Sequence, residues 1–507
     1  MKNKKSLLFI SLYTSSLLAS CGGSKEMMET IQVPSIYSGA GAIRVVGSDF
    51  ISPFDTSITA NLYCYQKEYT ENQLKEIKST IKDTFVECHA LSDRHYTYYK
   101  GDPEDGGNEI INVKYINDCC GENITIKVEP FLYNLLKKSY EFTIQSNGKF
   151  NMFLGSLADI YETRLENLDS ENKSALDSIL EYSTDLHFSS FTEEEKNKIA
   201  EVVDTLPKTK ADFEGILEFN DEYGTVKFNS YKGTKLKISL GGNAKGFATE
   251  YVSSVLQEKY PNISLLINSG FSSIKALGKR PDNKAWKIRY NNPVYYETKG
   301  TKENKYCSDE IAVEIDSGFN LSTSGYYQQY FYEYDKESDL FIRRNHIVDA
   351  NTGYSTSYFD QVSVFLDDAG LADMYTTALM NCSSIDEANS LFTSLNSYYE
   401  QSDAQVLYCF KSNISSSNEL FKYSINDFND LSASNLPIAI KKDGSEYDGD
   451  YSDISLSDIK DIKSSFSPFF NETYLLSSGL FAKARKLTDS EMTVQGKTKI
   501  ALLEELK

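Results

Sequence analysis

Positive charge is scarce in this chain of 507 residues. Its 52 Lys and Arg side chains are outnumbered by 73 Asp and Glu, which leaves a formal net charge of −21. A general affinity for nucleic acid or for an anionic membrane surface is therefore excluded, because both require a basic protein surface. A small anionic ligand fits this composition only where a local cation, a metal ion or backbone N–H groups reverse the field.

Metal-binding patterns of cysteine and histidine are also missing. The 8 cysteines contain no CxxC pair, and the 4 histidines form no cluster with them. A zinc site and a regular disulfide framework are therefore not expected. Setting aside Cys21, which has a separate role below, the remaining cysteines are odd in number. We expect buried thiols with one or two bridges at most.

Long apolar runs are absent except at the start of the chain. A basic beginning precedes an apolar core from Leu7 to Leu18, which is too short for a stable membrane span. The next residues, Leu-Ala-Ser-Cys, have the pattern of a bacterial lipoprotein signal. We expect residues 1–20 to be removed and Cys21 to be lipidated, which would anchor the protein on the extracytoplasmic face of the cell membrane. An ordinary secretory signal that ends near a cysteine is the alternative.

Composition divides the remaining chain into three parts. Residues 21–45 are rich in Gly and Ser and are predicted to be a tether. From 46 to 426, amphipathic helix patterns alternate with strand patterns, and the polar stretch 160–215 is predicted to be a helical peripheral part. Residues 427–507 are acidic and rich in turns, and are predicted to be an extension of unknown role. These patterns indicate an α+β fold with mixed sheets.

Local signals place several elements. Thr70 with Gln73 and Ser384 with Glu387 are capping boxes that predict helix starts. Apolar residues at helical spacing follow each of them. Further helices are expected from near Ala244 and over 370–381, and strands are expected at 54–65, 215–219, 225–229, 236–240, 263–268, 272–277, 285–290 and 361–366.

The stretch ISLGGNAKGFATEY joins an expected strand to an expected helix. Gly241 and Gly242 let the backbone approach a ligand, and Gly246 allows close packing of the helix. The free N–H groups at the start of the helix favour an anion, and Lys245 adds a full positive charge. A Gly-Gly turn before a helix is structural in many proteins. The spacing matches neither the Walker A loop nor the dinucleotide fingerprint.

Two later stretches carry further candidates. Asp373 and Thr377 lie one helical turn apart, and a carboxylate with a hydroxyl suits Mg²⁺. His346 precedes a turn at residues 351–353 and could accept a proton. Considered singly, a solvated acid, a packing threonine and a hydrogen-bonded structural histidine explain the same residues.

The order of these motifs resembles that of the ApbE family, the FAD:protein FMN transferases. The stretches FDTSITANLY, SNGKFNMFLGSLADIY, SLGGNAKGFA, INSG, LSTSGYYQQYF, HIVDANTG and ADMYTTAL follow in that order between about residues 50 and 425. The resemblance implies a two-part, T-fold-like α+β fold that binds FAD and Mg²⁺, often in exported lipoproteins. Members split the FAD pyrophosphate and pass FMN to a Ser or Thr hydroxyl of a partner protein. Some instead hydrolyse FAD to FMN and AMP.

The resemblance also implies roles for individual residues. The metal would be held by the Gly242 carbonyl, Asp373, Thr376 and Thr377. His346 and Asp373 would be the catalytic residues, with His346 as the base for the acceptor hydroxyl. The implied contacts to the flavin nucleotide are Phe54, Lys149, Phe150, Asn151, Ser239, Lys245 and Ile347.

Several positions depart from the family pattern. Ser239 and Asn151 stand where the family has Asp, Ala350 replaces a proline, and Ser269 to Ser272 replace a GG[DN] motif. We expect a lipid-anchored enzyme that uses Mg²⁺ to transfer FMN from FAD to an exported redox protein, which the sequence does not identify. The alternatives are an FAD pyrophosphatase for flavin salvage and a non-catalytic, flavin-binding surface lipoprotein.

Overall fold

The computed structural model describes residues 26–507 except 172–188, 281, 284, 292, 294–308, 328, 336–339, 357, 412–421, 424–437, 442–458, 464–471, 478–483, 487–498 and 503–507. Cys21 and the signal segment expected at 1–20 lie outside the described residues. Within the part of the chain that is described, no helix is both long enough and apolar enough to cross a membrane.

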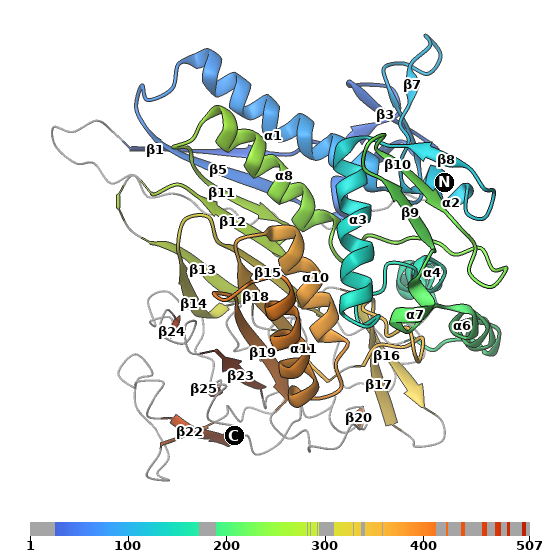
Figure 1. Cartoon of the computed structure of the whole chain (residues 1–507). Coiled ribbons are helices and arrows are strands. Elements are labelled where there is room, and N and C mark those ends of the chain that lie inside the picture. Colours follow the sequence, from blue (N-terminus) through green and yellow to red (C-terminus); the bar gives the residue numbers. More distant parts are fainter. Residues whose placement is uncertain are drawn as a thin grey trace.

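A nine-stranded sheet forms the frame of the fold (Figure 1). Neighbouring strands are antiparallel except for the last pair, which is parallel. Their order across the sheet is β1 (Glu26–Gln32), β5 (Ile58–Tyr65), β11 (Ser264–Ser269), β12 (Ser273–Leu277), β15 (Asn320–Gly325), β18 (Gln361–Leu366), β19 (Gln405–Lys411), β23 (Glu472–Leu476) and β25 (Lys499–Leu502).

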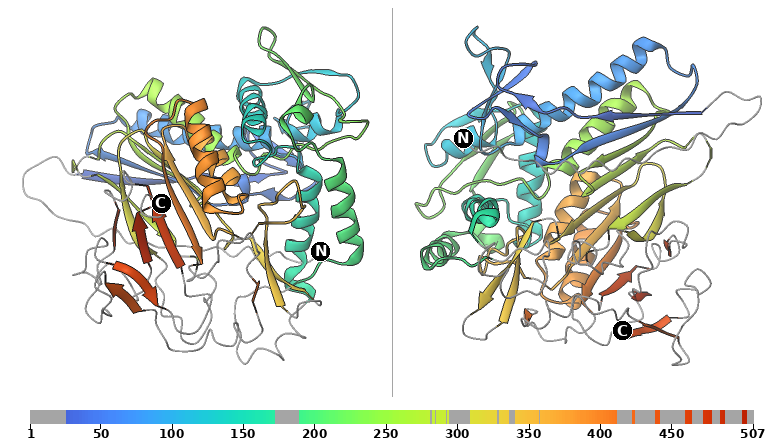
Figure 2. Two further views of the ribbon diagram at one scale, coloured as in Figure 1. Left: turned by 60° about the horizontal axis from the view of Figure 1, so that its bottom comes forward. Right: turned by 180° about the vertical axis from the view of Figure 1, so that it is seen from behind.

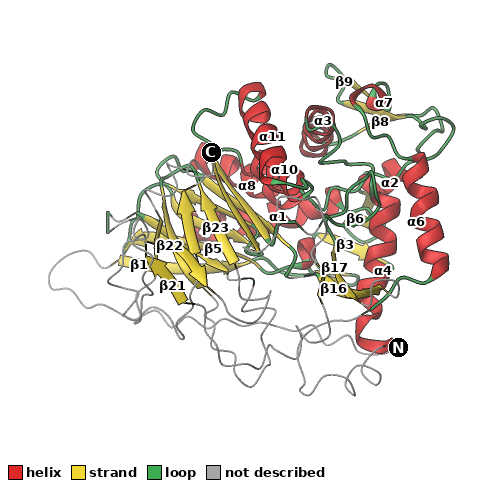
Figure 3. Ribbon diagram, turned by 90° about the horizontal axis from the view of Figure 1, so that it is seen from below, coloured by secondary structure: helices red, strands yellow, loops and turns green. Residues whose placement is uncertain are grey.

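Four helices cover one face of this sheet. They are α1 (Glu71–Ser92), α8 (Ala244–Lys259), α10 (Ala369–Met380) and α11 (Ile385–Tyr398). Figure 3 shows them gathered on the same side of the strands. Helix α10 packs on β15 and β18 and lies beside α8. Almost every residue of α10 is buried, because the helix is enclosed between the sheet and its neighbouring helices.

The opposite face of the sheet carries a smaller core. It is covered by β13 (Trp286–Asn291) and β14 (Asp309–Ile315), which pair with β24 (Ala484–Lys486). Trp286 and Val313 pack there with Phe365 and Leu407 of the large sheet. The large sheet is therefore buried on both faces, which explains the uninterrupted burial of β12 and β18.

A second part of the fold lies beside α8 and α10 (Figures 1 and 2). Its long helix, α3 (Pro130–Gln145), contacts α1 and α8. Around it lie α2 (Val113–Asp118), α4 (Gly155–Glu171), α6 (Glu193–Thr205), α7 (Lys210–Phe213) and a sheet of β8 (Thr125–Lys127), β10 (Thr225–Phe228) and β9 (Leu217–Asn220). The α+β class expected from the sequence is confirmed.

Short sheets complete the described structure. Near the N-terminus, β2 (Ile36–Tyr37) pairs with β4 (Phe50–Ile51), a 3₁₀ turn follows at Pro53–Asp55, and β3 (Ile43–Val46), β6 (Thr97–Lys100) and β7 (Asn108–Glu109) form a third group. Two further groups are β16 (Tyr330–Asp335), β17 (Leu340–Asn345) and β20 (Lys422–Tyr423), and the pair β21 (Ile438–Lys441) and β22 (Ile459–Lys463).

The large sheet extends beyond both expected boundaries of the central domain. The segment predicted to be a tether contains β1, which pairs with β5 from Glu26 to Gln32 and buries Ile31. The segment predicted to be an extension supplies β23 and β25 to the other side of the sheet. Gly, Ser and charged residues dominate both segments, so a composition average over 25 or more positions hides the strands within them.

Most local predictions are confirmed, with one exception. Thr70 and Gln73 form the capping box of α1, and the Ser384 hydroxyl caps α11 by accepting the Glu387 N–H at 3.1 Å. The strand expected at 236–240 is absent. That segment is extended, with a single bridge to Leu154 and two hydrogen bonds between the Ile238 backbone and the Asn117 side chain. An extended segment with side-chain partners has the same sequence pattern as a strand.

The close approach of α8 to α10 depends on the absence of a side chain at Gly246. A Cβ atom at this position would lie 2.2 Å from the Ala369 carbonyl oxygen and 2.7 Å from the Asp373 carboxyl carbon. Real Cβ atoms do not come this near to backbone atoms, so the two helices would have to separate.

We therefore predict that Gly246→Ala destabilises the protein by about 1–3 kcal/mol, because overpacking outweighs the gain in helix propensity. Gly241→Ala is the matched control, because its Cβ would meet nothing closer than the Ser239 hydroxyl oxygen at 4.0 Å. Thermal unfolding of both variants measures the difference. A melting temperature of Gly246→Ala equal to that of the control would contradict this account of the packing.

Candidate functional site

The two helices meet along a seam that contains four of the residues singled out in the sequence. The Thr377 hydroxyl donates to the Gly242 carbonyl at 3.1 Å, and the Gly246 N–H donates to the Asp373 carboxyl group at 2.7 Å. Gly242 and Gly246 are four residues apart, as are Thr377 and Asp373. The order of the contacts shows that the two segments are antiparallel. The seam therefore joins the start of α8 to α10 through contacts one helical turn apart.

Asp373 acts in this structure as a cap for α8 from outside the helix. Asn243, the residue at the N-cap position, makes no side-chain capping bond. The Gly246 N–H belongs to the first turn of α8, where backbone donors have no partner within the helix. The Asp373 carboxyl group satisfies this donor, and its charge lies at the positive end of the helix.

The surroundings of Asp373 oppose its ionisation. The residue is only 6% exposed, and this burial raises the pKa of its carboxyl group to about 7. A hydrogen bond from Ser322, the Lys245 charge and the Gly246 N–H act in the opposite direction and lower the pKa. At neutral pH the protonated and ionised forms of Asp373 are therefore present in similar amounts, and such shifted pKa values are common in functional sites.

Lys245 supplies a positive charge beside this acid. It is the second residue of α8 and is partly buried. Its ammonium group makes no hydrogen bond or ion pair with any of the residues that the structure describes. Burial lowers the pKa of Lys245, whereas the charges of Asp373 and Asp55 raise it. A partly buried cation without a partner at a helix N-terminus is suited to an anionic ligand.

The oxygen atoms of the seam fit a hard divalent cation. The Gly242 carbonyl, the Thr377 hydroxyl and the Asp373 carboxylate are the ligand types that Mg²⁺ prefers. Thr376 is placed differently, because its hydroxyl accepts from Ser324 at 2.8 Å and donates to the backbone carbonyl of Asp373 at 2.9 Å. The structure thus brings Thr377, and not Thr376, to Gly242.

His346 lies within electrostatic reach of Lys245. Its Nδ1 is 3.4 Å from the Gln329 carbonyl oxygen, which can only accept, so Nδ1 carries the hydrogen and Nε2 has the free lone pair. Although the side chain is exposed at one side, desolvation by the surrounding protein lowers the pKa of His346 to about 4, and the Lys245 charge acts in the same direction. The ring is neutral at pH 7 and can accept a proton. Ile347 behind it is buried.

The model of the ApbE family matches residues 108–398, which is more than half of the chain. This protein belongs to the ApbE family. No curated protein matches it.

Solved structures of ApbE proteins are similar to this chain at low sequence identity. The ApbE protein of Thermotoga maritima is 19% identical, with a TM-score of 0.48 over 71% of this chain and 92% of that chain. Flavin transferase ApbE from Vibrio cholerae is 17% identical, with a TM-score of 0.48 over 78% and 97%. The apo form of Pseudomonas stutzeri flavinyl transferase ApbE is 14% identical, with a TM-score of 0.47 over 81% and 98%.

The candidate contacts at Lys149, Phe150 and Asn151 divide into two kinds. Lys149 pairs with Glu387 at 2.8 Å and donates to a backbone carbonyl at 2.9 Å, so its charge is already matched. Asn151 is buried and uses both ends of its amide group within the protein. Phe150 instead reaches the seam, where its ring would lie 3.4 Å from a Cβ atom at Gly242.

The two remaining candidates are Ser239 and Phe54. Ser239 is partly buried in the segment that leads into the glycines, and its backbone N–H donates to the Met152 carbonyl at 2.8 Å. Phe54 lies on a turn before β5, and its backbone N–H is held by His89 at 3.1 Å. The flavin contacts implied for both residues stay predictions.

Sequence reasoning missed two residues that shape the site. Ser322 bonds to the Asp373 carboxyl group, and Asp55 affects the pKa of Lys245. Ser322 lies in the LSTSG stretch, where the alternation of a strand places Asn320, Ser322 and Ser324 on one face. That alternation was a usable signal. Asp55 gave none, because its approach to Lys245 joins segments far apart in the sequence.

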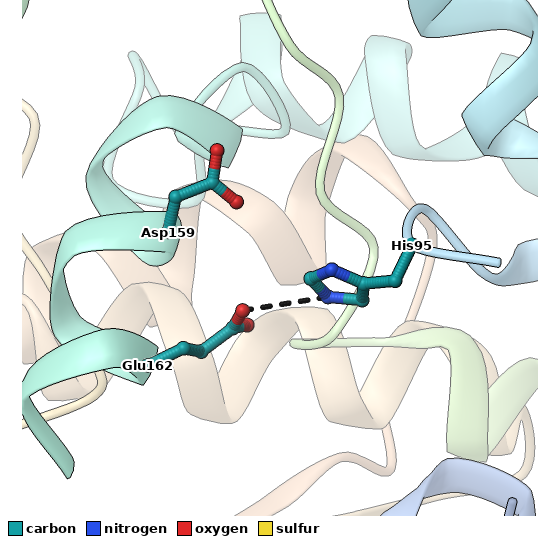
Figure 4. A group of neighbouring side chains, drawn as sticks. All are labelled: His95, Asp159 and Glu162. Carbon is teal, nitrogen blue, oxygen red and sulfur yellow. Dashed lines mark ion pairs between the residues drawn. The ribbon is translucent and has the colours of Figure 1, made fainter. Parts of the chain in front are cut away.

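A second group of possible metal ligands is formed by His95, Asp159 and Glu162 (Figure 4). The His95 Nε2 atom is 3.4 Å from the Glu162 carboxylate. Arg94 pairs with Asp159 at 2.5 Å and with Glu162 at 2.7 Å, and Lys237 pairs with Asp159 at 2.7 Å. Two cations already balance the two carboxylates, so this group is explained as an ion-pair network.

The pKa of Asp373 leads to a prediction about stability. The folded state raises this pKa from 3.8 to about 7, so the unfolded chain ionises first as the pH rises and stability is lost between about pH 4 and 7. Asparagine does not ionise. We therefore expect the free energy of unfolding of Asp373→Asn to be similar to that of the wild type below pH 4 and larger above pH 7. The difference should be about 1.4 kcal/mol for each pH unit that separates the unfolded-state and folded-state pKa values of Asp373.

Thermal unfolding of the ligand-free protein from pH 4 to pH 9 provides the measurement. Asp386→Asn, a change at an exposed carboxylate in the first turn of α11, is the control for removing a carboxylate outside the buried seam. A constant difference between Asp373→Asn and wild type at every pH would show that burial does not oppose ionisation here.

Proposed function

We propose that this protein is a Mg²⁺-dependent flavin transferase that moves FMN from FAD to a Ser or Thr hydroxyl of an exported redox protein. One observation carries the proposal. The Asp373 carboxyl group, the Thr377 hydroxyl and the Gly242 carbonyl meet along one seam, and beside them lies Lys245, which has no ion-pair partner among the described residues. Hard oxygen ligands next to a cation at a helix N-terminus suit a metal ion together with a diphosphate.

Each part of the site has a role in this reaction. The bare backbone at Gly241 and Gly242, the first turn of α8 and Lys245 would hold the diphosphate of FAD. Asp373, Thr377 and the Gly242 carbonyl would hold Mg²⁺, which when bound neutralises charge on the phosphate oxygens. Phosphoryl transfer depends mainly on such positioning and charge neutralisation.

The chemical step involves one bond made and one bond broken. The acceptor hydroxyl oxygen attacks the phosphorus of the FMN half of FAD, and the bond from that phosphorus to the bridging oxygen breaks, so AMP leaves. The hydroxyl proton passes to Nε2 of His346, which is neutral and unprotonated at pH 7. The products are flavinylated acceptor and AMP.

We further propose that the protein acts on the outer face of the cell membrane. The support is the lipoprotein pattern that ends at Cys21. Strand β1 begins at Glu26, so only four residues would separate the lipidated cysteine from the folded domain. A linker of this length would hold the enzyme close to the membrane surface.

One structural observation also favours a second candidate function. His346 is partly exposed, so water can reach the ring as readily as an acceptor hydroxyl. Attack by water would give FMN and AMP, which is the FAD pyrophosphatase reaction. A flavin-binding protein without catalysis is the third candidate, because Ser239 and Asn151 replace acids of the family pattern.

Product analysis separates the three candidates. The protein is incubated with FAD, Mg²⁺ and an exported acceptor protein, and the products are measured by mass spectrometry. We expect covalent, acid-stable flavin on the acceptor and an equal amount of AMP. Asp373→Ala should abolish turnover, because it removes the carboxylate of the proposed metal site, whereas Asp386→Ala should retain it. Free FMN and AMP would indicate the pyrophosphatase, and FAD binding without products would indicate the non-catalytic protein.

The role of Lys245 can be measured by binding alone. We expect Lys245→Ala to weaken FAD binding by about 1–3 kcal/mol, the range for a hydrogen bond to a charged group. Lys259→Ala is the matched control, because Lys259 lies at the other end of α8 and pairs with Glu76. Titration of the flavin fluorescence gives both affinities. Equal affinities of the two variants would remove Lys245 from the diphosphate site.

A further inference from the structure

The turn that carries Phe54 has an unusual backbone. Phe54 has φ 54° and ψ 26°, and the next residue, Asp55, has φ 52°. Neither is glycine, and two successive residues in the left-handed region are disfavoured. Such a conformation persists only where its surroundings enforce it, and it is concentrated at functional sites. The contacts of this turn therefore identify what holds it.

His89, near the end of α1, makes the main contact. Its Nδ1 atom accepts the Phe54 backbone N–H at 3.1 Å. The two rings meet edge to face, with centroids 5.1 Å apart at an angle of 70°. His89 is only 6% exposed, so this hydrogen bond is shielded from water. One side chain thus fixes both the backbone and the ring of Phe54.

The hydrogen-bond partners of His89 determine its tautomer. Because Nδ1 accepts, the hydrogen is on Nε2, which lies 3.1 Å from the Tyr98 hydroxyl oxygen. The Tyr98 hydroxyl donates in turn to Asp93 at 2.6 Å. Asp93 is fixed by the backbone N–H of Tyr96 at 3.1 Å. This ordered series keeps the Nδ1 lone pair directed at Phe54.

The turn is also joined to the seam between α8 and α10. The Gly270 N–H donates to the Ser57 carbonyl at 3.1 Å, which ties the turn to the residues after β11. On β11, the Ser269 hydroxyl is 2.7 Å from the Thr249 hydroxyl, which donates to the Lys245 carbonyl at 2.8 Å. Three hydrogen bonds through β11 therefore join Ser57, the residue after the turn, to the first turn of α8.

We propose that His89 is a positioning residue for the flavin half of the nucleotide. By accepting the Phe54 N–H it holds the Pro53–Thr56 turn in the left-handed conformation, with the Phe54 ring against His89 and the Asp55 carboxylate within electrostatic reach of Lys245. His89 itself is buried and touches no substrate. The inference rests on the proposed function, since it assumes that FAD binds at Lys245 with its flavin toward Phe54.

Three variants separate positioning from simple structural support. His89→Phe keeps a ring of similar size but removes the acceptor. His89→Asn places an amide oxygen near the position of Nδ1 and so restores an acceptor. Tyr98→Phe removes one hydroxyl and leaves His89 free to adopt the other tautomer. Thermal unfolding of each variant establishes that it is folded.

The measurement is the ratio of the affinities for FAD and ADP, because ADP has the diphosphate but lacks the flavin. We expect His89→Phe to weaken FAD binding roughly tenfold, as expected when a buried hydrogen bond is lost, and to leave ADP binding unchanged. His89→Asn should recover most of the FAD affinity. Tyr98→Phe should lower FAD affinity in the same direction, and it decides the question if His89→Phe does not fold.

The outcomes distinguish this inference from the function on which it rests. Wild type that binds neither FAD nor ADP would overturn the proposed function. Wild type that binds FAD, with an unchanged affinity ratio in His89→Phe, would overturn the inference alone. Equal losses of FAD and ADP affinity, or no recovery in His89→Asn, would also overturn it, because either result means that His89 only supports the fold.

Discussion

The hydrogen bond from the Gly246 N–H to the Asp373 carboxyl group is the interaction on which the site depends. It requires a helix N-terminus without its own side-chain cap and a neighbouring helix close enough to supply the acceptor. That closeness is possible only because position 246 has no side chain. The same approach brings Thr377 to the Gly242 carbonyl and excludes water from the acid. Packing, capping and the alignment of ligand oxygens therefore have one common cause.

The electrostatics of the site are unbalanced when the protein is considered by itself. Asp373 is buried in surroundings that oppose its ionisation, whereas Lys245 keeps a charge without a partner among the described residues. A metal ion would favour the ionised acid, and an anionic ligand would satisfy the lysine. The overall charge of −21 adds a general repulsion toward anions. An anionic ligand requires local groups that reverse this field, and the start of α8 offers a helix terminus together with a cation.

The sequence predicted the parts of the fold that short-range interactions determine. The capping box at Thr70 and the helical spacing after it specify α1 without reference to the rest of the chain. The seam residues were found because their motifs occur in the family order. The contacts of His89 with Phe54 and of Ser322 with Asp373 were not found, because each joins segments brought together only by the complete sheet. The outer strands β1, β23 and β25 were missed because they lie in segments of polar average composition, where their pairing with the sheet identifies them.

One departure from the family pattern, Asn151, has a structural use within its own turn. Asn151 donates to the Pro207 carbonyl at 2.9 Å and accepts the Phe153 N–H at 2.9 Å. An ionised aspartate could accept the Phe153 N–H but could not donate to the Pro207 carbonyl. Its negative charge would instead lie against the partly negative carbonyl oxygen of Pro207. The asparagine is therefore matched to this turn, and its loss of charge is a local structural adaptation. By contrast, Thr377 bonds to the Gly242 carbonyl and Asp373 bonds to the Gly246 N–H, with Lys245 beside them. Both hydrogen bonds of Asn151 therefore belong to its own turn rather than to the seam.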